Sequence, residues 1–229
     1  MSFFKRHDSS IINLRVFHNW IKNELLHRAK GLIDDKKIRI LDLAVGKAGD
    51  LHKWIGIGAD EIVGIDINKK SLYDKNGAYH RYNKMKGKMS KKQIPKCLFL
   101  HGNLSKRDTF DMLKNKLQDK RFNIVSCQFA IHYFFEKKES LSNFLDIVSY
   151  FLRENGVFIL TTMNGDAIKE ELKRKKGIIK NDIFRIKQLV LNDSCYGNKY
   201  SVSLGAMEGE DHYFSQKESN EYMVHKSEL

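Results

Sequence analysis

The sequence predicts an α/β protein built on a doubly wound parallel sheet. Two observations carry this prediction. Apolar, strand-like runs alternate with helix-like runs as far as residue 163. The first of these runs, residues 38–41, passes into a loop of small residues and then a helix-like segment, an arrangement that brings backbone N–H groups close to a ligand. A chain of 229 residues with 41% hydrophobic residues is long enough for one domain with a full core.

The elements follow from local pattern. Residues 9–30 have apolar positions at helical spacing, with Ser9 or Ser10 as the cap and Gly31 closing the helix. The expected strands are 38–41, 61–66, 97–103, 122–129 and 157–162. The expected helices are 51–54 onward, 68 onward, 108–119 and 139–152, the last ending near residues 155–156.

The alternation stops after residue 165. A helix is expected over 166–176, and short strands over 183–191 and 199–205. The further helix and closing strands that usually complete such a sheet are not recognisable, so we expect strand 157–162 to lie at an open edge.

The loop after the first strand indicates a nucleoside site. Residues 42–49, DLAVGKAG, precede Asp50, a possible helix N-cap. The second strand ends in Asp66, whose carboxylate can accept both hydroxyls of a ribose. Ala44 stands where the dinucleotide pattern G-x-G-x-x-G has its first glycine, so S-adenosylmethionine, which carries no phosphate, fits better. An ordinary strand-to-helix turn is the alternative.

Other polar residues follow the remaining strands. Because ligands of open α/β sheets bind at the carboxyl ends of the strands, the candidates are 42–47, Asp66, Asn103 and 128–133. The last segment, QFAIHY, places an amide, an imidazole and aromatic rings together, although a lone surface histidine is the commoner reading. We find no nucleophile motif, and methyl transfer to a nitrogen lone pair requires only alignment and a matched electrostatic field.

The charge predicts a polyanionic partner. Lysine and arginine number 41 against 28 acidic residues, a formal charge of +13, although a lysine-rich composition bias is the alternative. A lysine-rich segment, 84–96, follows Tyr79, Arg81 and Tyr82 and could track a phosphate backbone. The three cysteines form no C-x-x-C pair, which argues against structural zinc and favours a reducing compartment. We expect no metal and no membrane segment.

Four segments resemble the mRNA cap guanine-N7 methyltransferases of eukaryotes and large DNA viruses. Residues 17–22, FHNWIK, resemble the family's F-N-N-W-I-K helix, and 41–51, LDLAVGKAGDL, resemble L-D-L-G-C-G-K-G-G-D-L. Residues 126–133, SCQFAIHY, resemble S-x-Q-F-x-x-H-Y, and 220–224, NEYMV, resemble P-E-[FY]-L-V. The resemblance implies a class I S-adenosylmethionine-dependent methyltransferase (Rossmann-like) fold over 1–229, as a single domain, with the family's last strands missing.

The resemblance also implies the roles of individual residues. The residues that would hold S-adenosylmethionine are Lys22, Ala44, Gly46, Asp66, Asn103, Gln128 and Tyr133. The residues that would hold the cap are His18, Asn19, Lys47, Lys53, Arg81, His132 and Glu221. Phe129 or Phe214 would lie near the face of the guanine, Glu221 would accept its N1 and N2 hydrogens, and no residue would act by proton transfer.

The family's function implies methyl transfer to N7 of the guanosine cap of mRNA, with capped RNA and other capping-enzyme domains or subunits as partners. It implies a nuclear location for a cellular eukaryotic protein and the cytoplasm or virion for a viral one. Ala44, Val45, His18 and Asn103 depart from the family pattern, and with the missing strands they indicate a fragment, a split enzyme or a sheet completed by a partner. The alternatives are an inactive module that binds cap, RNA or a partner, and a small-molecule methyltransferase.

Overall fold

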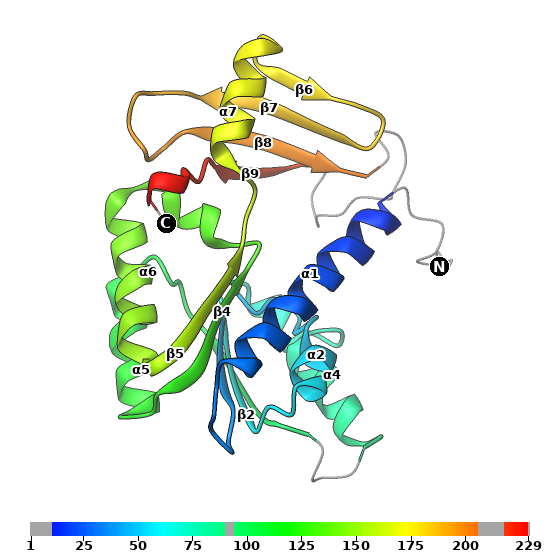
Figure 1. Cartoon of the computed structure of the whole chain (residues 1–229), viewed down its shortest axis with the longest axis vertical. Helices are drawn as coiled ribbons and strands as arrows, with labels where there is room; N and C mark the ends of the chain where they lie inside the picture. Colours follow the sequence, from blue (N-terminus) through cyan, green and yellow to red (C-terminus); the bar gives the residue numbers. More distant parts are fainter. Residues whose placement is uncertain (1–10, 90–93, 206–217, 229) are drawn as a thin grey trace. The chain divides into compact units, whose positions relative to one another are not determined.

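The computed structural model describes residues 11–89, 94–205 and 218–228 (Figure 1). Contacts divide the chain into two compact units. The parallel unit comprises residues 22–130 and 139–161, and the antiparallel unit comprises residues up to 21, 131–138 and from 162 onward. Each unit is described by itself.

The parallel unit is built on a five-stranded parallel sheet of order β3-β2-β1-β4-β5. Its strands are β1 (Arg39–Leu43), β2 (Glu61–Asp66), β3 (Lys96–His101), β4 (Phe122–Gln128) and β5 (Leu152–Thr161). Helices lie on both faces, α2 and α4 on one and α5 and α6 on the other (Figure 1). The doubly wound prediction is therefore confirmed, and β5 ends the strand order as expected.

The helices of this unit fall close to the predicted segments. They are α2 (Leu51–Gly56), α3 (Lys69–Tyr73), α4 (Ala78–Lys86), α5 (Arg107–Leu117) and α6 (Lys138–Phe151), together with the later part of α1 (Ile12–Gly31). Gly31 ends α1 as predicted, whereas Ser9 and Ser10 lie outside the described residues. The predicted end of α6 near residues 155–156 is wrong, because the chain joins β5 at Leu152, which pairs with Phe122.

The core of the parallel unit lies between the sheet and its helices. Ile40 and Ile62 from the sheet, Trp54 from α2 and Leu26 from α1 are buried in one apolar cluster. The apolar stripe predicted along α1, at Ile12, Val16, Phe17, Trp20, Ile21 and Leu25, is not the buried face of the helix. Val16, Phe17 and Trp20 are 60%, 52% and 59% exposed, and the buried residues are Leu26 and Ala29, outside the stripe. Helical spacing predicted the helix correctly but not the face that it buries.

The antiparallel unit contains a four-stranded sheet of order β6-β7-β8-β9. Its elements are α7 (Gly165–Arg174), β6 (Ile178–Lys180), β7 (Phe184–Val190), β8 (Lys199–Leu204), β9 (Ser219–Tyr222) and the 3₁₀ helices η2 (Ile131–Glu136) and η3 (Lys226–Glu228). Helix α7 packs on one face through Ile168 and Leu172, against Ile186, Tyr200 and Val202. β7 and β8 were predicted from sequence, and β6 and β9 were not. No helix in the described part of the chain is long and apolar enough to cross a membrane.

Gly64, at the centre of β2, sets how closely the loop after β1 approaches the sheet. A Cβ atom at this position would lie 2.8 Å from a methyl of Val45 and 2.9 Å from the ring of Phe99. We expect Gly64→Ala to lower the free energy of unfolding by about 1–3 kcal/mol, because a side chain there overpacks the core. Urea unfolding measures this change. Gly56→Ala, where a Cβ would have open space, is the control, and equal stability of the two variants would contradict the expectation.

Candidate functional site

The loop after β1 is held by hydrogen bonds to β2. The backbone N–H groups of Ala44 and Val45 both donate to the carbonyl of Ile65, at 2.9 Å, and the N–H of Gly46 donates to Asp66 Oδ2 at 2.7 Å. Three successive backbone donors are thus used within the protein. The loop therefore has no cradle of free N–H groups for a pyrophosphate at these positions, in agreement with the incomplete dinucleotide pattern.

This loop also adopts an unusual backbone conformation. Ala44 has a φ of 70° and Ala48 a φ of 53°, in the left-handed region that costs a residue with a Cβ atom about 1–2 kcal/mol. Gly46, with a φ of 55°, takes the same conformation without that cost. The hydrogen bonds to β2 hold the loop in this shape.

Asp66 lies at the tip of β2 with most of its surface buried. Its Oδ1 accepts the N–H of Asn68 at 2.8 Å, and its Oδ2 accepts that of Gly46. A carboxylate has about four lone-pair sites, so two remain for hydroxyl groups of a ligand. The next residue, Ile67, is apolar and 61% exposed, which offers a surface to a flat ring. Sequence analysis missed Ile67, although its place directly after Asp66 was visible.

Asp50 is the centre of a charged cluster beside the loop. Lys22 Nζ lies 2.8 Å and Lys53 Nζ 2.7 Å from Asp50 Oδ1, and all three side chains are less than a fifth exposed. Burial raises the pKa of Asp50, but the two ammonium groups outweigh it and hold the pKa below its usual value. Asp50 stands at the N-cap position of α2 as predicted, but its side chain makes no capping hydrogen bond, because its carboxylate is taken by the two lysines.

A second carboxyl group, Asp42, is buried in β1. Burial, together with the nearby charge of Asp50, raises the pKa of Asp42 well above its usual value. Lys22 acts in the opposite direction. The carboxyl groups of Asp42 and Asp50 thus lie near each other, and the ammonium groups of Lys22 and Lys53 offset their negative charge.

The end of β4 is fixed by β5. Gln128 Oε1 accepts the hydroxyl of Thr161 at 3.0 Å, and Gln128 Nε2 donates to Ser126 Oγ at 3.2 Å. Phe129 follows with a φ of 54°, and its N–H donates to the Thr161 carbonyl at 3.0 Å. A bulky residue in the left-handed region is strained, and such strain concentrates at functional sites.

The other predicted residues of the parallel unit differ in their contacts and exposure. Asn103, after β3, accepts the N–H of Ser105 through Oδ1 at 3.0 Å. Lys47 is exposed on the loop. Arg81, on α4, donates from Nε to the carbonyl of Asn76 at 3.2 Å on the surface. These positions are compatible with ligand contacts, and their roles stay predictions.

The antiparallel unit contains a buried polar cluster of three residues. His132, from η2, has its Nε2 3.7 Å from Oε1 of Glu221 on β9. Tyr200, the cross-strand neighbour of Glu221 on β8, donates its hydroxyl to Glu221 Oε2 at 2.9 Å. All three residues are at most 5% exposed, and neither ring nitrogen of His132 has a hydrogen-bond partner in the described residues. Buried polar atoms normally find partners, so this cluster has the character of a ligand site.

The charges of this cluster follow from its burial. Burial lowers the pKa of His132 to about 4, so the imidazole is neutral near pH 7. Burial raises the pKa of Glu221 to about 7, and the hydrogen bond from Tyr200 acts in the opposite direction. The 3.7 Å contact is therefore not a stable ion pair, because both shifts favour the neutral forms. Glu221 can change its charge near neutral pH.

The remaining predicted residues of this unit lie on η2 and on α1. Tyr133 has its ring centroid 4.3 Å from that of His132 and its hydroxyl 3.3 Å from Ser219 Oγ. On α1, His18 is half-buried and Asn19 is exposed. Phe214 lies outside the described residues.

Each unit thus brings together one group of predicted residues. The parallel unit gathers Ala44, Gly46 and Asp66 at one loop and places Lys22 and Lys53 on Asp50. The antiparallel unit gathers His132, Tyr133 and Glu221. Sequence analysis missed Tyr200 and the role of Asp50. Within the described ranges, no group of three or more His, Cys, Asp or Glu residues could hold a metal ion.

The fold is that of the class I methyltransferases. An S-adenosylmethionine-dependent methyltransferase from Clostridium acetobutylicum, 16% identical, superposes with a TM-score of 0.57 over 91% of this chain and 75% of that one. A protein from Pyrococcus horikoshii, also 16% identical, superposes with a TM-score of 0.57 over 96% of this chain and 80% of that one.

The family follows from sequence comparison. The profile of the mRNA (guanine-N(7))-methyltransferase domain matches residues 1–211, and the chain belongs to this family. The mRNA cap guanine-N(7) methyltransferase of Schizosaccharomyces pombe is 36% identical over 193 residues, 82% of this chain and 50% of that protein. The Caenorhabditis elegans protein of the same name is 35% identical over 185 residues, which are 79% of this chain and 47% of that protein. The chain thus spans about half the length of these curated relatives, and the resemblance seen in its motifs is confirmed.

The raised pKa of Glu221 predicts a pH-dependent stability. The folded protein binds this proton more tightly than the unfolded chain, so the stabilisation is present below about pH 4.5 and is lost as the pH rises through about 7. We expect the stability of the wild type relative to Glu221→Gln to fall by about 1–3 kcal/mol between pH 5 and pH 8. Urea unfolding at several pH values measures this difference.

The control for this experiment is Glu170→Gln on α7, whose side chain is exposed. Its stability should follow the wild type at every pH. A constant difference between the wild type and Glu221→Gln from pH 5 to pH 8 would show that Glu221 has an ordinary pKa.

Proposed function

We propose that this protein transfers a methyl group from S-adenosylmethionine to N7 of the guanosine cap at the 5′ end of mRNA. The buried cluster of His132 and Glu221 carries this proposal, because both ring nitrogens of His132 lack a hydrogen-bond partner in the described residues and lie beside a buried carboxyl group. Membership of the mRNA (guanine-N(7))-methyltransferase family supports the same reaction.

The cluster suits guanine for a chemical reason. The Watson–Crick edge of guanine presents two neighbouring donors, N1–H and N2–H, and a carboxylate accepts both. Glu221 is ionised in part near pH 7 and is held in place by Tyr200. A base bound through this edge leaves N7, an acceptor with a free lone pair, unobstructed on its other side. The partly ionised carboxylate would also favour the positive charge that the ring acquires on methylation.

The parallel unit fits the methyl donor. The two remaining lone-pair sites on Asp66 suit the ribose hydroxyls, and exposed Ile67 suits the adenine ring. Asn103 turns its oxygen to Ser105, which leaves its NH₂ group for a ring nitrogen. Lys22, fixed by Asp50, would attract the donor's carboxylate. When bound, S-adenosylmethionine supplies a methyl group activated by a positively charged sulfur.

The residues of the chain would act by placement. N7 carries no hydrogen, so no general base is needed, and holding the two reactants in line supplies the rate enhancement. Gln128 and Phe129, fixed by Thr161 at the end of β4, would form the wall beside the reacting atoms. Lys47, Lys53 and Arg81 would meet the phosphates of the cap, and His18 and Asn19 would contact the cap from α1.

The donor site is tested by Asp66→Asn. We expect the dissociation constant for S-adenosylmethionine to rise about 10- to 100-fold, because the amide offers one acceptor oxygen in place of two. Calorimetric titration measures the constant. Asp74→Asn, an exposed acid after α3, should bind like the wild type. Wild-type affinity in Asp66→Asn would remove Asp66 from the donor site.

The guanine site is tested by Glu221→Gln. We expect kcat/KM for capped RNA to fall about 10- to 100-fold while the affinity for S-adenosylmethionine stays unchanged. Transfer of labelled methyl groups to capped RNA measures the first quantity, and calorimetry measures the second. Glu170→Gln is the matched control. Unchanged kcat/KM in Glu221→Gln would refute the assignment of this site.

A further inference from the structure

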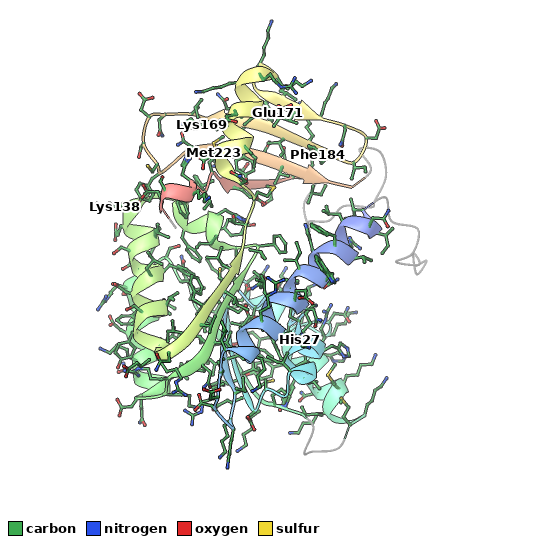
Figure 2. The ribbon with its side chains drawn as sticks, viewed as in Figure 1. His27, Lys138, Lys169, Glu171, Phe184 and Met223 are labelled. Atoms are coloured by element: carbon green, nitrogen blue, oxygen red, sulfur yellow. The ribbon has the colours of Figure 1, made fainter. Side chains whose placement is uncertain are left out.

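The antiparallel sheet has an outer face, on the side opposite α7, that is rich in positive charge. Cross-strand pairing places Ile179, Ile186, Tyr200 and Val202 on the inner face with the helix. Phe184, labelled in Figure 2, belongs to the same apolar cluster. Because side chains alternate along each strand, the neighbouring positions point to the outer face. These are Ile178 and Lys180 on β6, Arg185, Lys187 and Val190 on β7, Lys199, Ser201 and Ser203 on β8, and Asn220 and Tyr222 on β9. Ser201, at the centre of β8, is only 4% exposed.

No strand position on this outer face carries a carboxylate. Lys180 lies directly opposite Arg185, and like charges in such cross-strand pairs are destabilising. Lys187 is two residues further along β7, about 7 Å away. The arrangement therefore costs stability unless an anion lies against it.

Some positive charges of the parallel unit are paired with acids. There Arg107 pairs with Asp146, Lys120 with Glu61, and Arg153 with Asp35. By contrast, the described part of the chain shows no ion pair for Lys180, Arg185, Lys187 or Lys199. Asp182 lies in the turn that joins β6 to β7, Glu218 stands just before β9, and Glu136 accepts the hydroxyl of Tyr222 at 3.0 Å. Among the described residues, these four cations of the outer face thus have no carboxylate in an ion pair with them.

The other side chains of the outer face suit a nucleic acid. Ser203 and Asn220 can donate hydrogen bonds to phosphate oxygens. Tyr222 presents an aromatic ring beside Lys199, whose Nζ lies 5.9 Å from the ring centroid. Cations combined with an aromatic ring on a sheet are typical of surfaces that bind single strands. An acidic protein segment would use the charges but not the ring.

The outer face and the proposed guanine site share strand β9, although they lie on opposite faces of the sheet. Glu221 stands between Asn220 and Tyr222 on β9, which is the last strand in the order of this sheet. Its side chain points to the inner face, toward Tyr200, and the two flanking side chains point outward. A transcript held by its cap at Glu221 begins at the strand that borders the outer face.

We infer that the outer face of the antiparallel sheet binds the single-stranded RNA that follows the cap. This inference rests on the proposed function, and it names the part of the substrate beyond the cap and the surface that receives it. Lys180, Arg185, Lys187 and Lys199 contact successive phosphates, so the contact is electrostatic and independent of sequence.

The experiment compares a cap dinucleotide with capped RNAs of increasing length. In the wild type, we expect KM to fall as RNA is added beyond the cap. In the triple variant Lys180→Gln, Arg185→Gln, Lys187→Gln, the cap dinucleotide should be methylated as in the wild type, but KM should no longer fall with length. The dependence of RNA affinity on salt should become less steep by about 0.7 per lost contact, or about 2 in all.

Two matched variants serve as controls. Lys36→Gln, Lys116→Gln, Lys138→Gln removes three exposed charges elsewhere and should keep the length dependence. The charge-retaining variant Lys180→Arg, Arg185→Lys, Lys187→Arg should keep it as well. Loss of length dependence in the first control, or its persistence in the Gln triple variant, would overturn the inference.

Direct binding separates this inference from the reaction itself. Fluorescence anisotropy with uncapped single-stranded RNA should show weaker binding by the Gln triple variant, whether or not the cap is methylated. The wild type could fail to methylate the cap while the Gln triple variant still binds RNA more weakly than the wild type. That result would refute the proposed function and leave this inference standing. Equal affinity of the wild type for polyglutamate and for RNA of the same charge would assign the face to an acidic protein and overturn the inference.

Discussion

The hydrogen bonds of the Asp66 carboxylate hold the loop that defines the parallel unit's site. One oxygen fixes Gly46 in the loop after β1 and the other fixes Asn68 at the start of the next helix. Without the first bond, the left-handed conformation of Ala44 would have less to offset its cost. The same carboxylate thus holds the loop and keeps two lone-pair sites, which the proposed function assigns to the hydroxyl groups of a ribose. Gly64 complements it, because only the lack of a Cβ lets Val45 pack so closely on β2.

The fold could be predicted where structure is decided locally. Buried parallel strands are continuous apolar runs, so β2 and β4 were recognisable from residues 61–66 and 122–128. β9 was not, since its four residues, SNEY, contain no apolar run and become a strand only by pairing with β8. The end of α6 was misplaced for a related reason. Leu152 continues the helical pattern but is taken by pairing with Phe122, a contact that depends on a distant segment.

The site could be predicted in part, from strand ends and from family resemblance. Asp66 and Gln128 follow from their places at the ends of β2 and β4. The ion pair of Asp50 with Lys22 could not be predicted, because the two residues are 28 positions apart and no local pattern joins them. The local sequence indicated only that Asp50 stands at the start of a helix. Tyr200 was likewise invisible, since its contact with Glu221 exists only in the register of β8 with β9.

The distribution of charged residues helps to decide why lysine and arginine outnumber the acids. The two explanations are a composition bias and a polyanionic partner. A composition bias would scatter lysines without regard to the sheet face or to nearby carboxylates. In the parallel unit, cations such as Arg107 and Lys120 lie beside acids that neutralise them. On the antiparallel sheet the acid, Glu221, points inward to a buried cluster, while Arg185 and Lys187 point outward with no carboxylate among the strand positions of their face. The negative charge thus lies where the proposed function puts the hydrogen-bond donors of guanine. The positive charges lie where the further inference puts the RNA phosphates. This pattern favours a polyanionic partner, as the further inference proposes, over a bias of composition.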